Sequence, residues 1–135
     1  MTFSTTSAAL ESSLAALWKR TGVISHNIAN EDTPGYKAKR IAFEDSLARA
    51  IAGIESGRES KLSTISREDA YTRIATVKHE EYELEGLATR ADGNNVDIIN
   101  EQAELARVQI QYQAVRQRIS GYYSNLQYAI NGGRG

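Results

Sequence analysis

The sequence predicts an all-α fold in which a long N-terminal helix and a long C-terminal helix pack as an antiparallel, coiled-coil-like pair. Near the C-terminus, apolar residues recur at alternate spacings of three and four without a break, the pattern of a helix with one narrow apolar seam. A weaker stripe of the same kind lies near the N-terminus, and the only proline of the chain follows it. A short third helix and an extended or flexible middle segment complete the predicted architecture, which is one structural domain.

The N-terminal helix is expected within residues 1–30. Thr21 and Gly22 weaken its stripe, and Trp18 lies beside it, where packing is a better explanation than contact with a cofactor. The periodicity fits a hairpin whose two helices bury each other's seams, and it fits equally well helices that also contact other copies of the chain. The seam consists of Leu10, Leu14, Leu17, Ile24 and Ile28.

A single rigid turn follows this helix. Asn30 is suited to cap the helix C-terminus, and Pro34 disfavours helical conformation at Thr33. Pro34 and Gly35 fit the two central positions of a type II turn. The chain is therefore expected to change direction here at one fixed angle.

Residues 31–56 hold the turn and a short helix, and residues 57–96 form the extended or flexible middle segment. Apolar residues from Phe43 to Ile54 recur at helical spacing, which predicts a helix that ends near Gly53 or Gly57. The composition of residues 57–61 is that of a linker. Residues 71–77 alternate weakly, which favours a short strand or an extended arm.

The C-terminal helix is expected over residues 97–131, with a length of roughly 50 Å. Asn95 is a candidate N-cap. A second apolar row runs beside the seam and consists of Ile99, Ala103, Ala106, Ile110 and Ala114. A helix that is apolar on more than one side is expected to pack on more than one side. The seam itself consists of Leu105, Val108, Tyr112, Val115, Ile119, Tyr122 and Leu126.

The composition argues against several classes of function. Sixteen basic and 17 acidic residues give a net charge of −1, whereas a nucleic-acid partner needs a basic face. The chain has no cysteine, so disulfides, thiolate metal sites and thiol nucleophiles are excluded. The N-terminus lacks the basic and apolar regions of a cleaved signal peptide. No run approaches the roughly 18 apolar residues of a membrane span, so a soluble chain is expected.

The sequence contains no convincing catalytic, cofactor or metal site. The most suggestive cluster is His79, Glu80 and Glu81, which we interpret as a solvated acidic patch, because a metal would need converging ligands. Neither a nucleophile triad nor a phosphate-binding glycine loop is present, and no small-molecule substrate is expected. Lys37, Lys39 and Arg40 could meet an acidic neighbour or a phospholipid head group, although such a cluster is more often a solvated loop.

Two segments carry a resemblance to a known family. The segment NIANEDTPGYKAKR, residues 27–40, and the segment ADGNNVD, residues 91–97, are similar to signatures of the flagellar basal-body rod proteins, in the order and at the ends of the chain typical of proximal rod members. The resemblance covers roughly residues 8–50 and 88–131. The matching residues are Asn27, Ile28, Ala29, Asn30, Thr33, Pro34, Gly35, Tyr36, Asp92, Gly93, Asn94, Asn95, Val96 and Asp97.

This resemblance implies a structural subunit of the proximal rod, whose terminal helices assemble with those of other copies into the shaft that transmits torque and encloses the export channel. The implied partners are other rod proteins, a rod–ring adaptor protein, the membrane ring and the export gate. It also implies a periplasmic position in the basal body, after flagellar type III export without a cleaved signal peptide. The motif residues would then shape the subunit and its packing. The alternative is a stand-alone helical adaptor or chaperone-like binding module, and an enzyme is a weak third possibility.

Overall fold

The computed structural model describes residues 3–59, 66–85 and 90–132. Six elements follow one another along these residues, and four of them are helices. In chain order they are α1 (Phe3–Ala29), β1 (Lys39–Ala42), α2 (Glu44–Glu59), α3 (Arg67–Ala75), β2 (Glu80–Glu83) and α4 (Ile98–Ile130). None of the described helices is long and apolar enough to cross a membrane.

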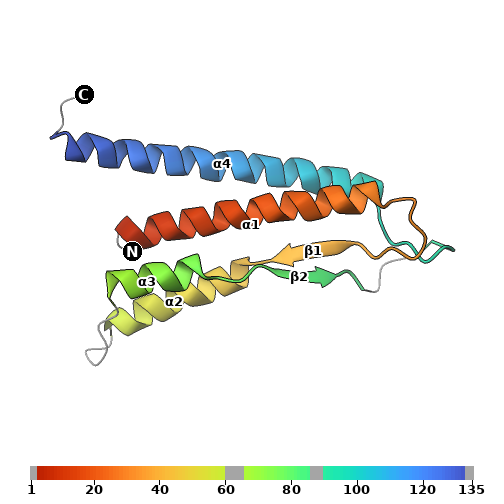
Figure 1. Ribbon diagram of the computed structural model, residues 1–135, viewed down its shortest axis with the longest axis horizontal. Coiled ribbons are helices and arrows are strands. Elements are labelled where there is room, and N and C mark those ends of the chain that lie inside the picture. The colour runs from red at the N-terminus through yellow and green to blue at the C-terminus, as the bar shows by residue number, and fades with distance from the viewer. Residues whose placement is uncertain (1–2, 60–65, 86–89, 133–135) are drawn as a thin grey trace.

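Helix α1 lies between two other layers of structure (Figure 1). Helix α4 runs antiparallel along one side of α1, while α2, α3 and the two-stranded β1–β2 sheet lie along the other. The start of α1 and the end of α4 are consequently at the same end of the molecule. The predicted helical fold with a packed pair of long terminal helices is confirmed.

The contact between α1 and α4 is a narrow apolar strip. Leu17, Ile24 and Val108 are buried in it, with Leu105 and Tyr112 packed against them. Ile28 and Val115 also contribute. Within α4, Val108 and Glu101 are the buried residues among those the structure describes. Helix α4 is therefore covered along one face only.

The opposite side of α1 carries small residues that let a second layer approach closely. Ala8 is buried together with Ile54 of α2 and with Ala70 and Ile74 of α3. Leu47 and Ile51 of α2 pack at the edge of this cluster. Two separate apolar clusters thus share α1, one on each side.

Among the described residues, a two-stranded sheet departs from the otherwise helical structure, and α2 and α3 lie between its strands in the sequence. Strands β1 and β2 pair antiparallel, with Lys39 opposite Glu83 and Ala42 opposite Glu80. Lys39 Nζ lies 3.2 Å from a carboxylate oxygen of Glu81, so the two strands also share an ion pair. All four residues of β2 are exposed, and the strand therefore adds little to the core.

Two predictions for the middle of the chain are wrong. Helix α2 ends at Glu59, near Gly57 as one of the two predicted ends had it, so the linker expected over residues 57–61 is helical over residues 57–59. Residues 71–75 are not a strand or an extended arm, because they form the second half of α3. Residues Glu80–Glu83 form β2, so part of the middle segment is extended, as expected. Of the predicted linker, Ser60 and Lys61 lie outside the described residues.

Candidate functional site

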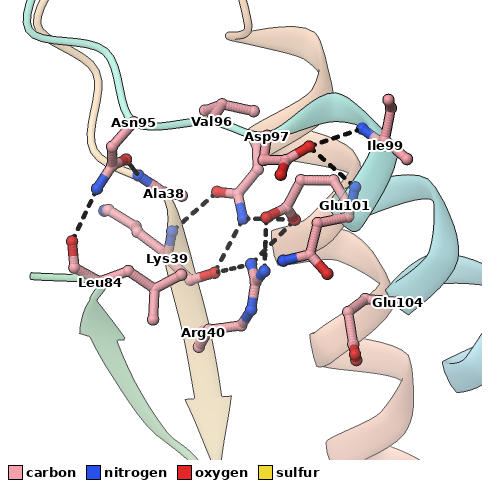
Figure 2. Close-up of polar contacts among 12 residues, drawn as sticks. Ala38, Lys39, Arg40, Leu84, Asn95, Val96, Asp97, Ile99, Glu101 and Glu104 are labelled. Atoms are coloured by element: carbon pink, nitrogen blue, oxygen red, sulfur yellow. Dashed lines mark hydrogen bonds and ion pairs between the residues drawn. The ribbon is translucent and has the colours of Figure 1, made fainter. Parts of the chain in front are cut away.

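A buried charged network joins β1 to the first turn of α4 (Figure 2). The Arg40 guanidinium donates two hydrogen bonds to the Glu101 carboxylate, from Nη2 to Oε1 at 2.6 Å and from Nη1 to Oε2 at 2.9 Å. The Glu101 side chain is 2 % exposed and that of Arg40 is 16 % exposed. A bidentate pair with this geometry repays part of the cost of removing two charges from water, but neither charge is tolerable alone.

Asn27, near the end of α1, connects this ion pair to the backbone of β1. Its Nδ2 donates to Glu101 Oε2 at 3.0 Å and to the carbonyl oxygen of Lys39 at 2.9 Å. Its Oδ1 accepts from the Lys39 amide at 3.0 Å and from the Tyr36 hydroxyl at 3.1 Å. Asn27 is fully buried, and all of its hydrogen-bonding capacity is used.

Asn94 performs a similar task at the C-terminal end of α1. Its Nδ2 lies 2.8 to 2.9 Å from three carbonyl oxygens, those of Asn30, Glu31 and Thr33. Carbonyl groups at a helix C-terminus and in the following turn lack intrahelical partners. The buried side-chain amide of Asn94 therefore provides the hydrogen bonds that these carbonyl groups would otherwise lack. Asn94 Oδ1 accepts from the Val96 amide at 2.7 Å, which fixes the side chain.

The Pro34–Gly35 turn is held directly by the second segment. The Tyr36 amide donates to the Thr33 carbonyl, as the predicted turn requires, and Gly35 has a φ of +72°. The Gly35 amide donates to the Asp92 carbonyl at 2.9 Å. Gly93 has a φ of +82°, and a Cβ added there would be in ordinary van der Waals contact with Gly35 Cα, at 3.5 Å. The positive φ of both residues, rather than steric crowding, therefore favours glycine in these two turns.

The last residues before α4 complete the contact (Figure 2). Asn95 Oδ1 accepts from the Ala38 amide at 2.7 Å, and its Nδ2 donates to the Leu84 carbonyl at 2.8 Å. Asn95 does not cap α4, contrary to the prediction. The N-cap is Asp97, whose carboxylate accepts from the amides of Ile99 and Asn100 at 3.1 Å.

We call this assembly of residues the polar junction. It brings the two motifs, residues 27–40 and 91–97, together at one end of the molecule. Burial is the main cause that raises the pKa of Tyr36, whose hydroxyl also contacts His26 Nδ1 at 2.8 Å. The members of the polar junction are Asn27, Tyr36, Arg40, Asn94, Asn95, Asp97 and Glu101.

The remaining motif residues lie around the polar junction. Ile28 belongs to the α1–α4 core, and Val96 is buried. Asn30 accepts from the Thr33 hydroxyl, which tightens the turn, and Asp92 accepts from the Asn94 amide. Ala29 and Pro34 are exposed. The motif residues thus fix the course of the chain between helices, and none of them converges on a cavity.

Seven of the predicted seam residues lie in the apolar cluster between α1 and α4, namely Leu17, Ile24, Ile28, Leu105, Val108, Tyr112 and Val115. Leu17, Ile24 and Val108 are buried, whereas the other members are half-buried. The half-buried members are Leu10, Leu14, Ile28, Leu105, Tyr112, Val115, Ile119, Tyr122 and Leu126.

Sequence reasoning missed Arg40 and Glu101 as a functional pair. The interpretation of Lys37, Lys39 and Arg40 as a solvated loop is wrong for Arg40, which meets an acidic neighbour in the core. Lys37 donates to the Gly93 carbonyl at 2.6 Å, and Lys39 pairs with Glu81. Trp18 packs its ring against that of Tyr112, with centroids 6.2 Å apart, but the residue is 70 % exposed and contributes little to the core.

The polar junction is suited to hold structure rather than to perform chemistry. Its ionisable groups are engaged in hydrogen bonds to one another and to the backbone. Within the described residues, no group of three His, Cys, Asp or Glu side chains is placed to hold a metal ion. Strand β2, which follows His79, carries Glu80 and Glu81 of the suspected patch, and both are exposed. The fold and the polar junction define a helical structural protein whose terminal helices are tied together at one end.

Comparison with known proteins agrees with this class. The family model described as "Flagella basal body rod protein" matches residues 9–37. The flagellar basal body rod protein FlgB of Bacillus subtilis (strain 168) is 34% identical over 133 residues, which cover 98% of each chain. FlgB of Aeromonas hydrophila is 32% identical over 84% of this chain and 83% of its own. FlgB of Escherichia coli (strain K12) is 29% identical over 85% of each. The chain belongs to the flagellar basal body rod protein FlgB family.

Proposed function

We propose that this chain is a structural subunit of the proximal rod of the bacterial flagellum, and that copies pack side by side through their terminal helices. The observation that carries the proposal is the exposure of α4. This helix has 33 residues, and Glu101 and Val108 are the buried ones among those described. A helix of this length that is covered on one face leaves most of its surface for neighbouring subunits.

The second apolar row on α4 supports the same proposal. The sequence predicts that this row is packed, yet in the single chain Ile99 is 77 % and Ile110 is 70 % exposed. Ala103, Ala106 and Ala114, which share this face, are exposed as well. Such a row is costly to leave in water and is typical of a surface that is covered in an assembly.

The same surface argues against a stand-alone adaptor or chaperone-like module. A self-sufficient helical domain would bury the outer face of its longest helix against its own chain. Membership of a family of rod proteins supports a structural role and provides no reason to expect enzymatic activity.

The subunit would assemble with other flagellar rod proteins in the basal body. We further propose that it contacts the rod–ring adaptor protein, the membrane ring and the export gate. Its place would be the periplasmic part of the rod, reached by flagellar type III export without a cleaved signal peptide. Torque would pass through many small contacts between helices, so the stiffness of the α1–α4 pair would be the mechanical requirement.

The test is a substitution on the outer face of α4. Ile110→Asp is expected to leave the helix content and unfolding midpoint of the purified chain unchanged, because Ile110 is exposed. In a strain that lacks its own gene for this protein, the variant is expected to abolish swimming in soft agar. Gln109→Asp, an exposed neighbour that faces another direction, is the control and should swim. Normal swimming by Ile110→Asp would refute a rod contact at this face.

A further inference from the structure

We propose that Trp18 of one copy inserts into a groove between α1 and α4 of the next copy. This inference rests on the proposed function and names the contact through which copies join.

Trp18 is a preformed projection. Its side chain is 70 % exposed, although tryptophan is the largest apolar side chain. The indole ring lies against the ring of Tyr112, with centroids 6.2 Å apart and planes tilted by 46°. Tyr112 therefore supports the indole on one side and limits the freedom that binding would have to remove. A braced, exposed tryptophan is the type of residue that dominates the energy of protein interfaces.

The groove has the size and chemistry to receive an indole ring. It encloses about 810 Å³, and Leu10 of α1 together with Ala114 of α4 provides apolar walls. Gly121 lines it without a side chain, and an added Cβ there would have no heavy atom within 4 Å. Arg118 also lines the groove, and a guanidinium group can lie over the face of an indole ring.

The groove also offers a partner for the indole N–H. Ser13, which lines it, donates its hydroxyl hydrogen to the Ala9 carbonyl at 2.7 Å. The hydroxyl oxygen is left as an acceptor, and a buried indole N–H usually needs one. The groove can thus satisfy both the apolar body and the polar edge of a tryptophan.

Trp18 lies outside the groove of its own copy. It packs against Tyr112 and is not among the residues that line the groove. At about 100° per residue, the lining residues of α1 lie roughly 80° to 180° around the helix from Trp18; they are Thr6, Ala9, Leu10 and Ser13. A copy therefore cannot fill its own groove with its own Trp18. Two different surfaces would meet at every contact, so the contact is heterologous and leaves a free projection and a free groove at the two ends.

The chain is well suited to a direct test because Trp18 is its only tryptophan. Trp18→Ala removes the projection. Gly121→Leu fills the groove, and the fold should accept it because the site is open and leucine has the higher helix propensity. Gly53→Leu is the matched control, because Gly53 is an exposed glycine of α2 with equally open space and lies outside the groove.

In sedimentation velocity, wild type and Gly53→Leu are expected to form larger species as concentration rises, while Trp18→Ala and Gly121→Leu each remain monomeric. A 1:1 mixture of the two monomeric variants should form dimers and nothing larger, because it contains one intact projection and one intact groove. The only tryptophan in this mixture is Trp18 of the Gly121→Leu copy. The quenching of its fluorescence by acrylamide should fall severalfold when the two variants are mixed, because the groove would shield the indole. Monomeric wild type, or a mixture that stays monomeric and fully quenched, would overturn the inference.

Swimming of the complemented deletion strain separates this inference from the proposed function. Wild type and Gly53→Leu are expected to restore swimming, and Trp18→Ala and Gly121→Leu are expected not to. If the two variants restore swimming, the Trp18 contact is wrong while the rod function stands. If wild type itself fails to restore swimming, the proposed function fails as well.

Discussion

Glu101 is the residue on which the polar junction depends most. Its two carboxylate oxygens accept from Arg40 and Asn27, and its side chain is almost completely removed from water. If the carboxylate is replaced, the Arg40 guanidinium stays largely buried without its counter-charge. The cost of such a change exceeds the net contribution of the intact pair, because the desolvation of Arg40 is no longer compensated.

Glu101→Gln is therefore expected to lower the free energy of unfolding by about 3 kcal/mol. Urea denaturation followed by circular dichroism at neutral pH measures this loss. Glu104→Gln is the matched control, since it breaks the pair with Arg107, which is 3.4 Å away and well exposed. Exposed pairs contribute little, so this control should lose less than about 0.5 kcal/mol. Equal losses in both variants would contradict the role assigned to Glu101.

A second prediction concerns Asn94, which donates to three carbonyl oxygens at the end of α1. Asn94→Asp keeps the shape but replaces the donor with a carboxylate that faces those oxygens. We expect a loss of about 2–4 kcal/mol, since buried acceptors lose their donor and a charge is buried beside them. Asn100→Asp, exposed in the first turn of α4, should be neutral or slightly stabilising because it lies at the positive end of the helix dipole.

Only part of the polar junction was predictable from the sequence. The Pro34–Gly35 turn followed from local rules, because a turn depends on its own four residues. Arg40 and Glu101 are 61 residues apart, and each has an ordinary local explanation, one in a polar loop and one in a first helical turn. A usable signal was Asn27, an amide between the seam positions Ile24 and Ile28, because an amide beside an apolar seam requires partners from elsewhere.

At the scale of elements, His79, the residue before β2, links this part of the chain to α1. Its ring meets the ring of Phe43 edge-on, with centroids 6.0 Å apart, and its Nε2 is buried without a partner among the described residues. Lys19 of α1 donates to the His79 carbonyl at 3.4 Å. Burial, and then the charge of Lys19, lower the pKa of His79 below its usual value of 6.5.

This pKa direction gives a prediction for the dependence of stability on pH. The folded chain favours neutral His79, so the unfolded chain binds more protons below the usual histidine pKa. Stability should fall as the pH drops from about 7 toward the lowered pKa of His79. His79→Phe keeps the ring and removes the titrating nitrogen, so its urea midpoint should change less between pH 7.5 and 5.5. If the urea midpoint of His79→Phe changed between pH 7.5 and 5.5 as much as that of wild type, His79 would not be the cause of the loss of stability at low pH.

Helix α3 shows why one element escaped prediction. It has nine residues, and Ala70 and Ile74 are the buried ones among those whose burial the structure describes, so its apolar period is too short to recognise. Its start does carry a signal: Ser66 accepts from the Asp69 amide at 3.0 Å, in the Ser-x-x-Asp pattern of a capping box. Long helices were predictable because every turn repeats the same spacing of apolar residues. A short helix has too few turns for this pattern, and its N-cap is then the main signal in the sequence.

At the scale of the whole molecule, α1 is the common support of both layers. Leu17 is 4 % exposed in the strip that joins α1 to α4. Leu17→Asp would place a carboxylate in this apolar contact and should cost about 3 kcal/mol or more. We expect a lower thermal midpoint and a chain that no longer supports swimming, because the pair of long helices separates.

Ser25→Asp is the control for this variant, since Ser25 is an exposed residue of the same helix. It should leave the thermal midpoint within a few degrees of wild type. Leu17→Asp and Ile110→Asp then differ in a diagnostic way, because the first should weaken both the fold and swimming and the second swimming alone. Normal swimming by Leu17→Asp would contradict the requirement for a rigid helix pair.

The distance along the chain between the partners of the polar junction has a consequence for timing. The hydrogen bond from Asn27 to Glu101 cannot form until Glu101, 74 residues later in the sequence, is present. A polypeptide threaded through a narrow conduit from its first residue onward would release α1 long before the side chain that locks it. Until about three quarters of the chain has emerged, Asn27 would lack its partner Glu101, and α1 would not be fixed to α4. The polar junction would therefore form only when the chain has almost completely left the conduit.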